Sequence, residues 1–107
     1  MQKTTRTDFI KTLKDYKKVS FGGVLNKRIS YDEVSGILDK LNIDNFDYNE
    51  VEFTSNAMKR KTDEGYSWLY FDKGDEVYKH EGKNYIVYLY KTFNTMVYIL
   101  NKGKGEK

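Results

Sequence analysis

The sequence has 107 residues, the size of one typical domain, and it contains neither cysteine nor proline. The absence of cysteine excludes disulfide bonds and thiolate metal sites. No apolar stretch approaches the roughly 18–20 residues of a membrane span, and the N-terminus lacks the apolar core of a signal peptide. We therefore expect a cytoplasmic protein that makes no contact with a membrane.

Charge is distributed unevenly along the chain, although its net charge is only +3. Residues 1–28 carry eight Lys or Arg and two Asp, a net charge of +6, whereas residues 29–54 carry one Lys and seven acidic residues, a net charge of −6. Residues 55–107 add ten basic and seven acidic residues, a net charge of +3. This segregation predicts either a basic and an acidic face or a fold in which the segments neutralise each other.

A first helix is predicted near Thr7–Val19, because three large apolar residues recur there at helical spacing: Phe9, Leu13 and Tyr16. Thr5 or Thr7 can cap the free amide groups at its start. The stretch Phe21-Gly22-Gly23 is expected to break the helix, since paired glycines adopt positive φ at little cost. Residues 24–28 are expected to form a short strand or an extended link.

A second helix is predicted at Ser30–Leu41. Ser30 and Glu33 form a capping box, in which each side chain can satisfy the other's free backbone amide. Ile29 would pack ahead of the cap in a hydrophobic staple. Four apolar residues then make a single stripe: Val34, Ile37, Leu38 and Leu41. We expect the helix to stop at Asn42.

From about residue 46 the chemistry favours strands. Val51 and Phe53 alternate with polar residues, as a half-buried strand requires. Residues 59–65, Lys-Arg-Lys-Thr-Asp-Glu-Gly, are predicted to form an exposed turn or loop. Residues 66–71 are predicted to form a strand with apolar side chains on both faces, Tyr66, Trp68 and Tyr70 on one and Leu69 and Phe71 on the other.

The C-terminal half is predicted to continue as strands. Residues 72–75 and 81–84 have the composition of hairpin turns and bracket a short strand around Glu76–His80. The spacing of residues 85–100 also fits a helix, but their density of Tyr, Val, Ile and Thr favours two strands, Tyr85–Lys91 and Thr95–Leu100. Residues 101–107 are predicted to form a flexible basic tail.

These elements predict the α+β class, with two N-terminal helices packed on an antiparallel meander sheet of four to five strands. No internal repeat or linker divides the chain, so residues 1–100 are expected to form a single domain. The helices would cover one face of the sheet, and the other face would be rich in exposed tyrosine.

The sequence offers little for catalysis. His80 is the only imidazole, so a transition metal would lack its usual nitrogen and sulfur ligands. The serines lie outside glycine-flanked nucleophile elbows, and Gly22-Gly23 lacks the spacing of a phosphate loop. We predict no catalytic residue, no metal and no cofactor. Solvated acidic residues, with a carboxylate-only Mg²⁺ site as the alternative, are expected at Asp44, Asp47, Glu50 and Glu52.

Two alternatives involve nucleic acid. The cationic stretch Lys59-Arg60-Lys61 beside the aromatic residues 66–70 suits a small RNA- or DNA-binding regulator, because phosphate contacts and base stacking bind single strands. The acidic middle of the chain would repel phosphate. The enzymatic alternative is a metal-independent ribonuclease, whose phosphodiester would be positioned and polarised by Tyr78, Lys79, His80, Lys83 and Arg60.

Protein binding is the function that the sequence favours, because Tyr, Trp, Phe, Met and Arg are enriched at protein interfaces. Ten tyrosines exceed what one small core needs, so some should form an exposed aromatic patch. The candidate partner-binding residues are Lys59, Arg60, Lys61, Tyr66, Trp68, Tyr70, Tyr88 and Tyr90.

The whole chain resembles the short orphan proteins of bacteriophages and mobile elements of low-GC bacteria. The likeness lies in its richness in Lys, Asn and Tyr, its single Ala57, the capped helix Ser30–Leu41 and the aromatic stretch Tyr85–Tyr90. That group includes anti-CRISPR and anti-restriction proteins, which usually block a host nuclease stoichiometrically. The resemblance implies a non-enzymatic inhibitor that binds a host protein or nucleoprotein complex, as a monomer or small homo-oligomer. It is one of style and assigns no functional residue.

Overall fold

A computed structural model describes residues 1–25 and 30–104. Within this part of the chain, two α-helices, two 3₁₀ turns and eight strands follow one another as β1 (Gln2–Thr4), α1 (Arg6–Tyr16), β2 (Lys18–Leu25), α2 (Tyr31–Leu38), η1 (Ile43–Asn45), β3 (Asn49–Phe53), β4 (Ala57–Thr62), β5 (Gly65–Tyr70), β6 (Glu76–Glu81), β7 (Tyr85–Lys91), β8 (Thr95–Asn101) and η2 (Lys102–Lys104). The strands form one antiparallel sheet in the order β1-β6-β7-β8-β2-β3-β4-β5.

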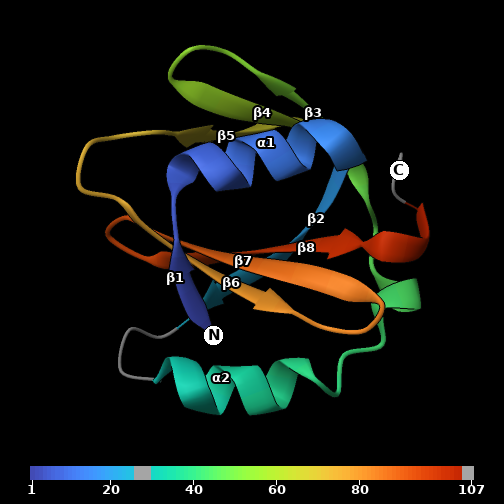
Figure 1. Cartoon of the computed structure of the whole chain (residues 1–107). Helices are drawn as coiled ribbons and strands as arrows, with labels where there is room; N and C mark the ends of the chain where they lie inside the picture. Colours follow the sequence, from blue (N-terminus) through green and yellow to red (C-terminus); the bar gives the residue numbers. More distant parts are fainter. Residues whose placement is uncertain (26–29, 105–107) are drawn as a thin grey trace.

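The predicted fold is wrong in the size of the sheet and in the placing of the helices. The described residues form eight strands instead of four or five, β1 precedes α1, and β2 separates the two helices. The helices cover opposite faces of the sheet, with α2 below β6, β7 and β8 and α1 above them (Figure 1). The protein therefore has two hydrophobic cores instead of one.

The first core surrounds α1. Phe9 and Leu13 of the helix have no exposed surface and pack against Tyr88 and Tyr90 of β7. Buried side chains of β4 and β5 join the same cluster, so the sheet curls around the helix and contacts it from two sides (Figure 1). The curl occurs where β2 and β3 share only two residue pairs.

The second core lies beneath α2. Val34 and Leu38 of the helix pack against the alternate residues of β7, namely Tyr85, Val87 and Leu89. The predicted pair of strands in residues 85–100 is confirmed. Since both faces of β7 are covered, its residues 85–90 are all buried, which explains why the apolar pattern also fitted a helix.

The first helix ends three residues before its predicted end. Lys17 adopts the left-handed conformation with φ 64°, and its N–H donates a hydrogen bond to the carbonyl of Leu13. The chain then enters β2, where the paired glycines lie inside the strand and do not end the helix. A β-bulge lies between Phe21 and Gly23, and a Cβ atom on Gly22 would come within 3.1 Å of Val97.

The predicted cap of the second helix is confirmed, because the N–H of Glu33 donates to Ser30 Oγ at 3.3 Å. The helix ends at Leu38 and not at Leu41. After Leu38 the hydrogen bonding tightens to a three-residue spacing, in which the N–H of Lys40 donates to the carbonyl of Ile37. Residues 26–28 of the predicted link and Ile29 of the predicted staple lie outside the described residues.

Two predicted connections differ from the structure. The turn at residues 72–75 forms, but it links β5 at one end of the sheet to β6 near the other end, so it is not a hairpin. The hairpin at residues 81–84 between β6 and β7 is confirmed. The predicted flexible tail is wrong for its first residues, because Asn101 is buried at the end of β8 and the N–H of Lys102 donates to the carbonyl of Asn84. Residues 105–107 of that tail are not among those described.

Candidate functional site

A row of three aromatic side chains covers one face of β5. Tyr66, Trp68 and Tyr70 are 59%, 46% and 64% exposed, whereas Leu69 on the opposite face is buried. The predicted division of residues 66–71 between two faces is therefore confirmed for this strand. We call Tyr66, Trp68 and Tyr70 the aromatic row.

The rings of the aromatic row lie close to one another and to a lysine of β4. Trp68 and Tyr70 are stacked, with ring centroids 5.9 Å apart and an angle of 13° between the planes. Lys59, which pairs with Trp68 across the two strands, places its Nζ 4.4 Å from the Tyr66 ring and 5.7 Å from the Trp68 ring. Part of the ring faces is thus occupied within the protein.

The basic residues beside the row do not form the predicted exposed loop, because Lys59 and Lys61 belong to β4. Lys59 Nζ lies 3.1 Å from Glu52 of β3, and Lys61 Nζ lies 3.3 Å from Glu50 and 3.6 Å from Glu52. The hydrogen bond and the charge of Lys59, with the charge of Lys61, lower the pKa of Glu52. The hydrogen bond and charge of Glu50, with the charge of Glu52, raise the pKa of Lys61. The two lysines are therefore neutralised locally.

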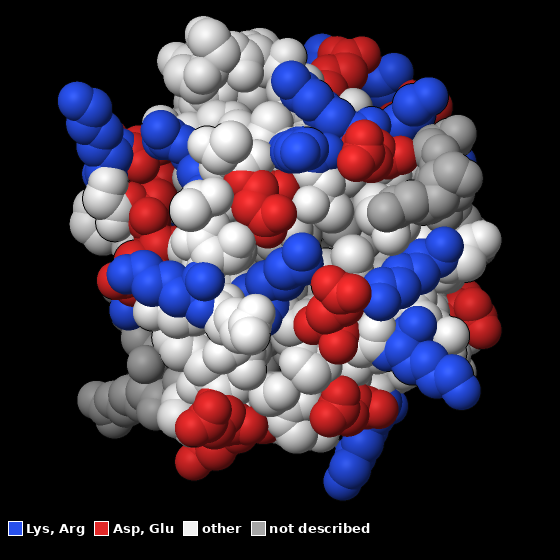
Figure 2. Space-filling model, viewed as in Figure 1, with Lys and Arg blue, Asp and Glu red and all other residues white. Residues whose placement is uncertain are grey.

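These contacts show how the charged segments of the chain are combined. Acidic residues of β3, from the −6 segment, pair across the strands with basic residues of β4. Lys79 of β6 lies 3.8 Å from Asp8 of α1, although both residues belong to segments of net positive charge. On the face shown in Figure 2, basic and acidic side chains are interspersed, without a broad area of one sign. Between β3 and β4, the acidic segment is therefore neutralised by lysines of residues 55–107.

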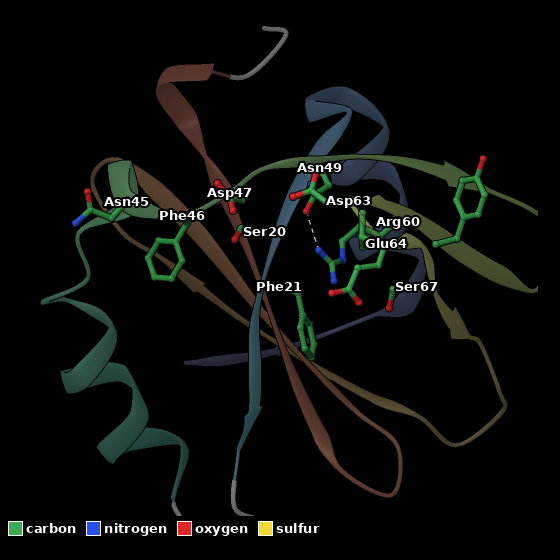
Figure 3. A pocket seen from close by; sticks show the side chains of 12 residues that line it. Ser20, Phe21, Asn45, Phe46, Asp47, Asn49, Arg60, Asp63, Glu64 and Ser67 are labelled. Carbon is green, nitrogen blue, oxygen red and sulfur yellow. Dashed lines mark hydrogen bonds between the residues drawn. The ribbon is translucent and has the colours of Figure 1, made fainter.

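Arg60, the middle residue of the predicted basic stretch, points to the other side of β4. Its Nη1 donates to Asn49 Oδ1 at 2.7 Å, and its Cζ lies 5.3 Å from the centre of the Phe21 ring. It lines an open pocket of about 730 Å³ together with Asp47, Asp63 and Glu64, among others (Figure 3). Because neighbouring residues of a strand alternate between faces, Arg60 does not act with Lys59 and Lys61.

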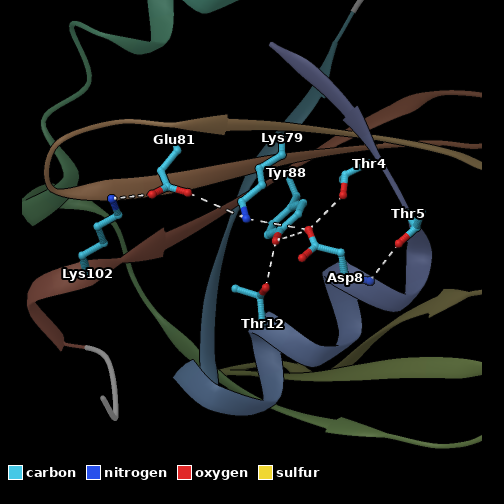
Figure 4. Close-up of polar contacts among 8 residues, drawn as sticks. All are labelled: Thr4, Thr5, Asp8, Thr12, Lys79, Glu81, Tyr88 and Lys102. Atoms are coloured by element: carbon cyan, nitrogen blue, oxygen red, sulfur yellow. Dashed lines mark hydrogen bonds and ion pairs between the residues drawn. The ribbon is translucent and has the colours of Figure 1, made fainter.

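Tyr88 and Tyr90 do not belong to any surface, which corrects their assignment as partner-binding residues. Neither has exposed surface. The hydroxyl of Tyr88 donates to Asp8 Oδ2 at 2.9 Å (Figure 4), and that of Tyr90 donates to Asp75 Oδ2 at 2.9 Å. Burial raises the pKa of both phenols. The physical reason is the first core, in which Phe9 of α1 packs directly against both rings.

The residues of the ribonuclease alternative are not brought together. Tyr78 faces α2, where its ring stacks on Tyr31 with centroids 4.0 Å apart. Lys79, the next residue, faces α1 and lies near Asp8. Arg60 belongs to the separate pocket described above.

His80 takes part in a chain of contacts that the sequence did not predict. Its Nδ1 lies 3.0 Å from Ser35 Oγ, and its Nε2 lies 2.9 Å from Asp39 Oδ1. Ser35 lies inside α2, where backbone N–H groups are used by the helix and cannot stabilise an oxyanion. The contact attaches α2 to β6. Ser35 and Asp39 share a helix face by their spacing, but nothing in the sequence paired them with His80.

The described residues include no group of three or more His, Asp or Glu side chains that could hold a metal ion. None of the helices in this part of the chain has both the length and the apolar character needed to cross a membrane.

The fold and the surface together define a class: a small, sheet-dominated α+β protein with exposed aromatic residues on a terminal strand. No protein-family model, curated protein or solved structure matches the chain.

Proposed function

We propose that this protein is non-enzymatic and acts by binding another protein through the aromatic row of β5. The observation that carries the proposal is the exposure of three large rings, 46–64% each, side by side on a regular strand. An aromatic side chain buries on the order of 150–250 Å² when it is fully covered, and such residues contribute most of the binding energy at protein interfaces.

The surroundings of the row favour a protein over a nucleic acid as the partner. Lys59 and Lys61 are paired with glutamates, so their charges are balanced locally and attract phosphates less strongly. Arg60 lies on the opposite face of β4, hydrogen-bonded to Asn49. The stacking of Trp68 on Tyr70 leaves less ring face for bases. Rings flanked by paired charges match the anchor and polar rim of a protein interface.

For the identity of the partner, we propose a host nuclease or nucleoprotein complex in the cytoplasm, blocked by stoichiometric binding. The support for this step is the resemblance to phage and mobile-element inhibitors. It is separate from the argument for protein binding, and it has its own measurement, the activity of the captured nuclease.

The test begins with affinity capture from a nuclease-treated bacterial lysate, followed by binding measurements on the purified partner. We expect Trp68→Ala and Tyr70→Ala each to weaken binding by at least about 30-fold, the effect of losing a hot-spot residue. Ile37→Ala is the matched control, because Ile37 is 61% exposed on α2 and should leave affinity within about twofold.

Two results would contradict the proposal. Equal affinity of the wild type and Trp68→Ala would remove the aromatic row from the interface. Capture that requires nucleic acid, together with direct nucleic-acid binding that falls steeply with salt, would replace the protein partner by the RNA- or DNA-binding alternative. Binding without loss of nuclease activity would reject only the inhibitor step.

A further inference from the structure

We infer that two copies of this chain associate through the free edge of β5, paired as antiparallel strands in one continuous sheet. The inference concerns the backbone of β5, so it is independent of what the aromatic row binds. β5 directs backbone groups away from the sheet, has no paired strand on its outer side among the described residues, and is complementary to itself over residues 65–70.

Half of the backbone groups of β5 point away from the sheet. β5 is the last strand in the sheet and pairs only with β4. Thr62 and Gly65 flank a two-residue turn and therefore form a hydrogen-bonded pair, after which bonded and non-bonded pairs alternate. The bond from Phe71 N–H to the carbonyl of Asn56, at 2.8 Å, follows the same alternation. The N–H and C=O groups of Tyr66, Trp68 and Tyr70 consequently face the free edge.

Among the described residues, no strand besides β4 pairs with β5, and the space beside its outer edge is an open groove. The groove, of about 520 Å³, is lined by Trp68 and Tyr70 from one face of β5 and by Leu69 from the other. Its remaining lining comes from residues 72–75 of the connection to β6, from residues 91–93 at the end of β7 and the turn after it, and from Met96 of β8. Because side chains from both faces of β5 line it, the groove lies at the edge of the strand.

The two ends of the sheet differ in their protection. At one end β1 has only three residues, and Lys3 within it lies 4.0 Å from Glu76. Short strands and lysines are features that prevent pairing with another chain. At the other end β5 has six residues, no charge, no proline and an uninterrupted register with β4. Only the β5 end is therefore suited to accept a strand.

A second copy of β5 fits this edge because the strand is complementary to itself. With a two-fold axis at Trp68, each Trp68 lies opposite its equivalent, and Tyr66 lies opposite Tyr70 of the second copy. About six backbone hydrogen bonds would form, and aromatic cross-strand pairs are favourable. Within residues 65–70 no charges face each other, since these residues are uncharged. The symmetry is isologous, the commonest in homodimers, and it joins two aromatic rows into one surface.

The first test measures mass by light scattering and sedimentation equilibrium over a range of protein concentrations. We expect a dimer that dissociates on dilution. Tyr70→Pro removes an N–H that faces the edge while sparing the bonds to β4, and Tyr70→Ala removes the same ring but keeps that N–H. The dissociation constant should rise at least about tenfold more for Tyr70→Pro than for Tyr70→Ala, since each dimer loses two hydrogen bonds.

A second pair of variants serves if Tyr70→Pro does not fold. Ser67 is exposed on the face opposite the aromatic row and lies next to the proposed axis. Ser67→Lys should give a monomer, because the two ammonium groups would lie near each other, whereas Ser67→Gln should remain a dimer. A wild type that is monomeric at every concentration, or a dimer unaffected by Ser67→Lys, would overturn the inference.

The register has its own test, because the wild-type sequence contains no cysteine. In Trp68→Cys the two introduced residues lie directly opposite each other, about 5.5 Å apart between Cα atoms, within the range of a disulfide. In Tyr66→Cys they are displaced by four residues, about 14 Å along the strand. Oxidation should therefore cross-link Trp68→Cys only. Equal cross-linking of both variants would reject the antiparallel register.

The experiments also separate this inference from the proposed function. Ser67→Lys keeps all three rings of the row, so a monomeric Ser67→Lys that still binds the purified partner supports both proposals. Loss of partner binding in Trp68→Ala, measured at a protein concentration at which that variant is still a dimer, would do the same. A monomeric wild type that needs Trp68 for partner binding would reject the dimer and keep the binding proposal.

Discussion

The hydroxyl of Tyr88 offers a direct measure of how much buried polar contacts stabilise the first core. Tyr88 has no exposed surface, and its hydroxyl donates to Asp8 Oδ2 at 2.9 Å and lies 3.0 Å from Thr12 Oγ1 (Figure 4). Asp8 also accepts a hydrogen bond from Thr4 at 3.0 Å and lies 3.8 Å from Lys79 Nζ. The network joins β1, α1, β6 and β7, so removing one hydroxyl tests how these elements are held together.

Tyr88→Phe should lower the free energy of unfolding by about 1.5–3 kcal/mol, the usual contribution of a hydrogen bond to a charged group. The value should fall in the lower half of that range, because Asp8 keeps Thr4 and Lys79 as partners. Phenylalanine preserves the ring and its edge contact with Phe9, whose centroid lies 5.1 Å away, so no large cavity adds to the loss.

Urea unfolding followed by circular dichroism gives the measurement, and Tyr66→Phe is the matched control. Tyr66 loses the same hydroxyl from a side chain that is 59% exposed, so its effect should stay within about 0.5 kcal/mol. A double-mutant cycle of Tyr88→Phe with Asp8→Ala should give a coupling energy above about 0.5 kcal/mol. If Tyr88→Phe costs no more than Tyr66→Phe, the assignment of the network to folding stability is wrong.

Three further predictions concern local features. Ser30→Ala removes the cap of α2 and should lower the free energy of unfolding in urea by about 1 kcal/mol; an unchanged value would contradict the capping bond. In thermal unfolding, Gly36→Ala should stabilise the protein by up to about 1 kcal/mol, because the added Cβ atom meets open space. Gly82→Ala should destabilise it by about 1–3 kcal/mol, because the added Cβ atom falls 2.5 Å from the Tyr85 ring. Burial raises the pKa of Tyr98 to about 12. The protonated phenol therefore contributes fully to stability below pH 10, and this contribution is lost as the pH rises toward 12. Over that interval, the unfolding midpoint of Tyr98→Phe should fall less than that of the wild type.

Local signals in the sequence were sufficient for several elements. The capping box located the start of α2, and alternation located β3 and the two faces of β5. The density of Tyr, Val, Ile and Thr located the two strands of residues 85–100. The capping box involves residues only three positions apart, and alternation shows only that one face of a strand is apolar and has to be buried. These signals do not depend on which strand becomes the neighbour.

The elements that prediction missed depend on partners distant in the sequence. In β4, Lys59 and Lys61 have the composition of a loop, but Glu50 and Glu52 on the neighbouring strand compensate their charges. In β2, a Cβ atom on Gly22 would lie only 3.1 Å from Val97, and local sequence cannot show that close approach. Strand pairing therefore decided both segments against their local propensities.

The candidate site was predicted in part, for a related reason. Alternation placed Tyr66, Trp68 and Tyr70 on one face of a strand, and the structure exposes them. Tyr88 and Tyr90 follow the same rule of alternation, but helices cover both faces of β7. The sequence argument compared the number of tyrosines with the capacity of one core. The interior is larger, because the helices on opposite faces of the sheet create two cores.

The two cores also show that the rings of the aromatic row are not needed to fill the interior. The tyrosines of β7 fill space between the sheet and a helix, and the hydroxyls of Tyr85 and Tyr88 donate to groups on α2 and α1. β5 already contributes Leu69 to the first core from its inner face, so the outward rings of Tyr66 and Trp68 are not needed to fill it. Large rings that packing does not require, next to lysines whose charges are already compensated, support the proposal that β5 contacts another protein.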